Sequence, residues 1–231
     1  MKKLPIAVAL TSCLAFSSAM ADNDDNYRTY HVTITNTTAH HVITPPVVIA
    51  HNKRFKLFNI AQPSSDELAT MAETGNNEPL LTSLADNMNV SATASGSGIH
   101  AGESITVEIM APKRSHFTVA GMLATTNDAF TAVTLKGPKY RRNTYGMAMT
   151  YDAGSEENNE LCTYIPGPPC NTDVVDGAVV NLNMRAADHA EGIVTIHNGV
   201  HGVAGVGTSG LIPALHDWRG PTAMIKIHNG G

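Results

Sequence analysis

Short runs in which apolar and polar residues alternate recur along this chain, and they constrain its fold more than any other feature. In the run Tyr27–Asn36, the apolar residues Tyr30, Val32 and Ile34 are spaced two apart, with threonine and histidine between them. A period of two is typical of a β-strand with one buried face. The 19 glycines and 12 prolines among the 231 residues interrupt long helices and favour short elements joined by turns.

The same alternation predicts strands through the second half of the chain. Eight or nine short strands with turn signals between them indicate an all-β fold, an antiparallel β-sandwich. The further predicted strands are Ser104–Met110, Phe117–Leu123, Phe130–Leu135, Gly146–Tyr151, Ala178–Leu182, Ile193–His197 and Ala223–His228.

The segment between the early and late strands differs from the rest. Residues Ser64–Glu73 predict a short helix, because Ser65 can cap its start, acids fill its first turn and Gly75 follows its end. Pro79–Asn87 predicts a second one. We expect residues 42–49, with two prolines, to form a sheet edge. We expect the Ala/Ser/Gly-rich residues 92–98 to form a loop.

The first residues have the pattern of a secretory signal peptide. Two lysines precede an apolar stretch, Leu4–Phe16, that is too short to span a bilayer, and Ala19-Met20-Ala21 resembles a cleavage site. We therefore expect Met1–Ala21 to be removed from an exported protein that is periplasmic or secreted. An alternative is a lipoprotein signal with the lipid on Cys13.

The remaining chain predicts a mobile leader over residues 22–26 and one domain over residues 27–229. It contains no run of 18 apolar residues, so we expect no transmembrane segment. The formal net charge is −5, which gives no polycationic surface for a nucleic acid partner. In an oxidising compartment we expect Cys162 and Cys170 to form a disulfide that staples a proline-rich loop.

Six phrases, taken in order, resemble the spondin N-terminal (F-spondin-like) domain family in its stand-alone bacterial form. They are Tyr27–Asn36, Ile43–His51, Thr126–Phe130, Thr150–Glu156, Ile165–Pro168 and Asp217–Ile225. The resemblance implies a C2-like antiparallel β-sandwich in an extracellular or matrix setting. It also implies a calcium ion held by three acids, which Asp128, Asp152 and Glu156 match here. Ala129 replaces an aromatic residue of the family pattern, and Glu156 replaces an aspartate.

The residues themselves are compatible with calcium. Calcium takes six to eight oxygen ligands in irregular geometry, and a tight turn at Gly154 can fold Asp152 and Glu156 toward one point. The alternative is a solvated acidic turn, because residues 156–160 are polar throughout.

Eleven histidines suggest a second kind of site. Imidazole binds copper and zinc well, and His51, His197, His201 and His216 are the candidate ligands. The alternative is that each is a hydrogen-bonded structural or surface residue. Methionine could add soft copper ligands, but Met147 and Met149 are predicted to share one strand face and to pack in the core.

Catalytic chemistry has little support in the sequence. The run Gly205–Gly210 lacks the spacing of a nucleophile elbow and of a phosphate loop. Trp218 is expected to plug the core rather than to stack on a ligand. The basic run Lys136–Arg142 is expected to be a solvated hairpin turn rather than a site for an acidic polysaccharide.

We therefore expect a non-enzymatic, calcium-stabilised binding module with an unknown extracellular or periplasmic partner, such as a glycan or a matrix protein. The alternative is a periplasmic copper- or zinc-binding protein that uses its histidines. A hydrolase is the third hypothesis, for which no catalytic residues can be nominated.

Overall fold

The computed structural model describes residues 26–166, 170, 174–175, 178–179, 185–203 and 211–230. The expected signal peptide, nearly all of the leader, the whole glycine-rich run Gly205–Gly210 and part of the predicted strand Ala178–Leu182 lie outside these residues. In the described part of the chain, no helix is long and apolar enough to cross a membrane.

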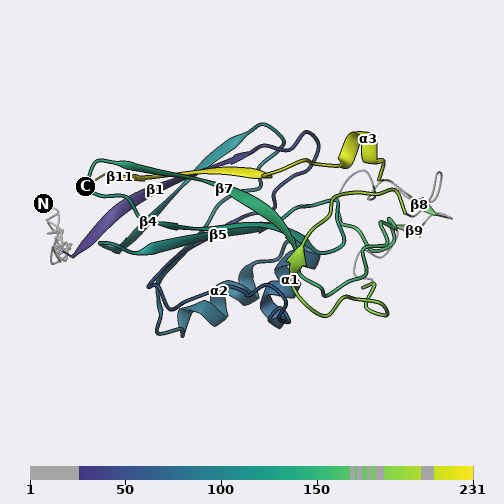
Figure 1. The fold of residues 1–231 in the computed structure, drawn as a ribbon, viewed down its shortest axis with the longest axis horizontal. Coiled ribbons are helices and arrows are strands. Elements are labelled where there is room, and N and C mark those ends of the chain that lie inside the picture. The colour runs from purple at the N-terminus through teal and green to yellow at the C-terminus, as the bar shows by residue number, and fades with distance from the viewer. Residues whose placement is uncertain are drawn as a thin grey trace, which may run out of the picture.

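Strands dominate the described residues, and the helices are short (Figure 1). The strands are β1 (Tyr27–Asn36), β2 (Val47–His51), β3 (Val90–Ser95), β4 (Ser104–Pro112), β5 (His116–Met122), β6 (Ala129–Lys136), β7 (Asn143–Asp152), β8 (Val174–Val175), β9 (Ala178–Val179), β10 (Thr195–Ile196) and β11 (Ala223–Asn229). The helices are α1 (Asp66–Thr74), α2 (Glu78–Ala85) and α3 (Pro213–His216).

The main sheet has the strand order β3-β2-β5-β6-β7-β11-β1-β4, and β10 pairs with β7. Strand β7 belongs to both halves of this sheet, since residues 143–148 pair with β11 and residues 149–152 pair with β6. All these pairings are antiparallel. The two halves fold toward each other in a sandwich-like arrangement, which confirms the predicted all-β fold with short helices inserted.

The main core lies between the two halves. Alternation turns Tyr30, Val32 and Ile34 of β1 inward, where they meet residues from both halves of the sheet. The rings of Tyr30 and Phe117 lie 4.7 Å apart, centre to centre. Trp218 packs against this core while half-buried, as the plug hypothesis predicts.

A second core forms on the outer side of β2, β5 and β6, where α1 and α2 cover the sheet. Figure 1 shows both helices on one side of the strands. The predicted caps of α1 are confirmed: the Leu68 N–H donates to Ser65 Oγ at 3.3 Å. Gly75 has a φ of 73°, and its N–H donates to the Met71 carbonyl. These caps satisfy groups that the helix ends would otherwise leave unpaired.

Three sequence predictions about strands were wrong. Residues 92–95 belong to β3 rather than to a loop, because small side chains can still complete a ladder against β2. Strand β2 is not an edge but pairs with both β3 and β5, since its ladder starts at Val47, directly after the two prolines. The segment Ile193–His197 forms only the two-residue strand β10.

The Ser65 cap gives a direct test of how α1 is stabilised. We expect Ser65→Ala to lower the free energy of unfolding by about 1 kcal/mol, because the Leu68 N–H loses its acceptor. Urea denaturation followed by circular dichroism measures this change. The matched variant Ser64→Ala should have little effect, and equal stability of Ser65→Ala and the unmodified chain would contradict the assigned cap.

Candidate functional site

Two of the predicted calcium ligands lie side by side where β6 begins and β7 ends. Asp128 immediately precedes β6, and Asp152 is the last residue of β7. Ala129 and Asp152 are directly paired across the ladder. Beyond this pair, the Ala153 N–H donates to the Asp128 carbonyl at 3.2 Å. The antiparallel register therefore places the two aspartates together.

The turn after β7 folds the chain back over Asp128. The Gly154 N–H donates to Asp152 Oδ1 at 2.6 Å. Gly154 has a φ of 69°, and a Cβ added there would collide with the backbone of Ile193, so glycine is required. Asp128 Oδ2 then accepts the backbone N–H groups of Ser155 at 2.7 Å and Glu156 at 3.0 Å.

All three acids are buried, and two of them, Asp128 and Glu156, have a carboxylate oxygen without a partner among the residues that the structure describes. Within the described residues, Asp128 Oδ1 and Glu156 Oε2 are buried with no hydrogen-bond partner. A buried carboxylate with a free oxygen is costly unless a cation or donor reaches it.

Burial is the main cause of the raised pKa of each acid. The pKa of Asp128 is raised by burial and then by the charge of Asp152. The pKa of Asp152 is raised by burial and by the charge of Glu191, although Asn158 opposes the shift. Burial raises the pKa of Glu156 to about 8, with further contributions from Glu73 and Asp128.

The third acid is directed differently from the two aspartates. Glu156 Oε1 accepts the Ala186 N–H at 3.1 Å, so its carboxyl group contacts the segment that begins at residue 185. Arg185 lowers the pKa of Glu156, but its guanidinium is paired with Glu73 at 2.7 Å. No group of three or more His, Cys, Asp or Glu side chains in an arrangement that could hold a metal occurs among the described residues.

Sequence reasoning missed two residues that contact Asp152 or act on it. The Asn158 amide donates to Asp152 Oδ2 and also to Glu191 Oε1, the latter at 3.1 Å. Asn158 belongs to the polar run 156–160, but its sequence context does not distinguish it from the other residues of that run. Nothing in the spacing indicated Glu191, because a separate segment brings it to the site.

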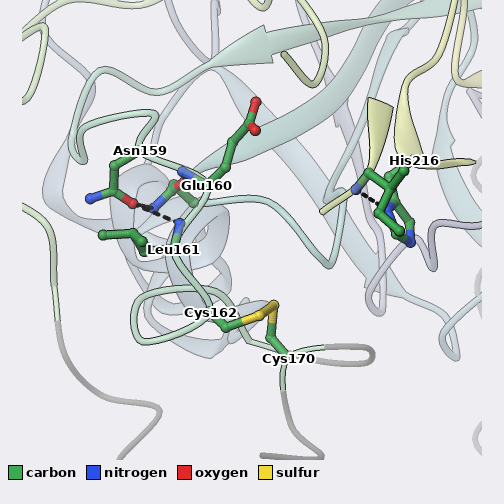
Figure 2. The surroundings of a disulfide bond; sticks show 8 residues. Asn159, Glu160, Leu161, Cys162, Cys170 and His216 are labelled. Atoms are coloured by element: carbon green, nitrogen blue, oxygen red, sulfur yellow. Dashed lines mark hydrogen bonds between the residues drawn. A yellow bond between two sulfur atoms is a disulfide. The ribbon is translucent and has the colours of Figure 1, made fainter. Parts of the chain in front are cut away.

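The predicted disulfide closes the loop that follows the acidic turn. Cys162 and Cys170 are bonded, as Figure 2 shows next to the segment Asn159–Leu161. Cys170 is buried in a small apolar cluster with Ile165, Val200 and Leu211. The disulfide thus fixes the loop against a neighbouring segment, as expected of a staple.

Glu160 connects the same loop to the segment 201–203 by hydrogen bonds. Its side chain is buried and accepts the backbone N–H groups of His201 at 2.5 Å and Val203 at 3.0 Å. Glu160, Asn127, Asn158, His197 and His201 are among the residues that line a small cavity beside the acidic site.

The four candidate histidine ligands do not form one group. His197 and His216 lie near Trp218 and His41, with the rings of His197 and Trp218 5.1 Å apart. His51 pairs with His116 at the start of β5. Strand β5 then runs for seven residues, about 20 Å, before the chain reaches Ala124, whose carbonyl contacts His41.

Hydrogen bonds occupy most ring nitrogens of these histidines. His197 Nδ1 accepts the Gly199 N–H at 3.0 Å, and His197 Nε2 lies 3.1 Å from Asn158 Oδ1. Burial lowers the pKa of His197 to about 4, with smaller contributions from His201 and His41. His216 Nδ1 accepts the Ile212 N–H at 2.8 Å. Both nitrogens of His51 also have partners, the Asn52 carbonyl and Thr118 Oγ1.

The basic run is a largely exposed turn, as expected, but it does not close a regular hairpin, because β6 and β7 pair only at Ala129–Ala132 and Met149–Asp152. It joins β6 to β7, with Arg141 at a φ of 54°. The Arg141 guanidinium lies 5.1 Å from the centre of the exposed Tyr140 ring.

Comparisons with known proteins give no family for this chain. No protein-family model matches it, and no curated protein matches it. The resemblance to the spondin N-terminal family therefore stays a hypothesis that rests on the six sequence phrases.

The raised pKa values predict an unusual dependence of stability on pH in a chelator. Because the pKa values of Asp128, Asp152 and Glu156 are raised on folding, the folded chain binds more protons than the unfolded chain. Its free energy of unfolding should then fall as pH rises from about 6.5 to about 8.5. The lowered pKa of His197 opposes this slope only below about pH 7.5, because above that pH the imidazole is mostly neutral in both states.

Urea denaturation in EDTA across this range measures the slope. Asp128→Asn should make the slope shallower, since one buried ionisable group is removed. A chelated protein whose stability is constant or rises over this range would contradict the assignment of buried carboxyl groups with raised pKa values.

Proposed function

We propose that this domain is an exported, non-enzymatic binding module in which one calcium ion stabilises the loops at the β6–β7 end. Asp128 and Asp152 would hold the ion, and Glu156 would join them once its side chain turns away from Ala186. The observation that carries the proposal is the burial of these acids with an unpartnered oxygen on both Asp128 and Glu156. Buried charges in proteins are normally paired or bound to a metal.

The chemistry of the donors favours a hard cation. The side chains at the site offer carboxylate and amide oxygens, with Asn158 and Glu191 next to Asp152. Calcium accepts such oxygens and tolerates irregular arrangements. When bound, it would supply the positive charge that the buried carboxylates lack. The amide of Asn158 can present its oxygen after a rotation of the side chain.

Calcium would act here by fixing loops rather than by taking part in a reaction. Asp128 precedes β6, whereas Asp152 and Glu156 flank the turn after β7, so one ion would join the two segments. The disulfide and Glu160 already restrain the continuation of the second segment. Rigid loops lose less entropy when they bind a partner.

Thermal unfolding tests the calcium site. Protein purified without chelator should melt at a lower temperature after EDTA treatment, and added calcium should restore the melting temperature. Calcium at 100 times its dissociation constant stabilises the folded state by about 2.7 kcal/mol. Asp128→Asn and Asp152→Asn should abolish the response, and Glu103→Gln, an exposed acid on another loop, should preserve it.

Elemental analysis of the same protein distinguishes a calcium-binding module from a copper- or zinc-binding protein. Calcium that is lost in Asp152→Asn supports the proposal. Copper or zinc in its place, lost in His197→Ala, would support the histidine-based metal protein instead. A melting temperature that neither EDTA nor calcium changes would overturn the calcium proposal.

A further inference from the structure

We infer that the thioethers of Met147, Met149 and Met224 form a binding site for a soft monovalent metal ion, and that this ion is Cu(I). The sequence predicts correctly that Met147 and Met149 share a strand face. The prediction that they pack in the core is wrong, because the exposed fractions of Met147, Met149 and Met224 are 55%, 39% and 37%.

Strand register brings the three methionines together. Met147 of β7 and Met224 of β11 are directly paired, which places their Cβ atoms about 5 Å apart. Met149 follows two residues along β7 on the same face, about 7 Å from Met147. It lies diagonally opposite Met224, at about 7–8 Å. Each thioether is carried on a flexible unbranched chain, so the three sulfurs can turn toward one point above the sheet.

At Met147 and Met224 this face lies outside both cores, whereas Met149 sits at the border of the second core, opposite Ala132. Helices α1 and α2 pack against β3, β5 and β6, and the inward residues next to these methionines, Ala148, Ala223 and Ile225, fill the main core. The thioethers therefore face outward, where they are free to bind a metal ion.

The ligand chemistry selects Cu(I). Thioether sulfur is a soft, uncharged ligand that binds Cu(I) in preference to hard cations such as calcium. Lys226 lies on the same face, two residues after Met224 in β11. Its positive charge repels a monovalent ion less than a divalent one. The site is chemically distinct from the acidic site, which offers oxygen ligands, so this inference does not depend on the proposed function.

Titration with Cu(I) under anaerobic conditions tests the inference. We expect the full chain to withdraw one equivalent of Cu(I) from a chromogenic Cu(I) chelator. The variant Met147→Leu/Met149→Leu/Met224→Leu should lose this binding by at least tenfold. Leucine conserves volume and the positions are exposed, so the variant should fold, which its thermal melt verifies. The matched control is Met88→Leu/Met110→Leu, which removes two exposed methionines elsewhere and should bind as the unmodified chain does.

A second measurement identifies which methionines bind the Cu(I) ion. In a sample with 13C-labelled methionine methyl groups, Cu(I) should shift three methyl signals, and these should be the signals missing from the triple variant. Absence of Cu(I) binding, or equal binding by the triple variant, would overturn the inference. Cu(I) binding that the triple methionine variant retains and that His40→Ala/His216→Ala loses would also overturn the inference, because such a result would place the ion at the histidines.

Discussion

The antiparallel pairing of β6 with the second half of β7 is the constraint on which the candidate site depends. It sets Ala129 opposite Asp152, and so places two aspartates next to each other at the end of the ladder. Hydrophobic burial in both cores holds these strands in register, since a shift by one residue would turn the side chains of the shifted strand to the opposite face. The stability of the fold thus compensates for bringing two negative charges together.

Hydrogen bonds commit most of the polar groups around the aspartates. Backbone N–H groups of Ser155 and Glu156 saturate one oxygen of Asp128 while the other stays buried and unpartnered. The nearby imidazole of His197 is held between the Gly199 N–H and Asn158. Both of its ring nitrogens are therefore committed to hydrogen bonds.

The sequence predicted most strands and the α1 helix because their signals are local. Alternation located β1, and the Ser65 and Gly75 caps located α1. Strand β3 was missed because its alternation is carried mainly by alanines among serine and threonine, which gives a weak hydrophobic signal. Its pairing with β2 is a tertiary event. Among the site residues, Asp128 and Asp152 could be predicted together, whereas Glu191 reaches the site through a distant segment. Alternation also placed Met147 and Met149 on one face, but it could not tell which face the helices leave uncovered.

The first strand is hydrogen-bonded to the last one, with Ile34 opposite Ile225. The amino end of a chain leaves the ribosome before the segments that follow it, so β1 must wait for its partner until β11 has been synthesised. During that interval the inward side chains of β1 are only partly covered, and long-range pairing of this kind forms slowly. Loss of β11 would therefore leave β1 with one unpaired edge, open to association with other chains.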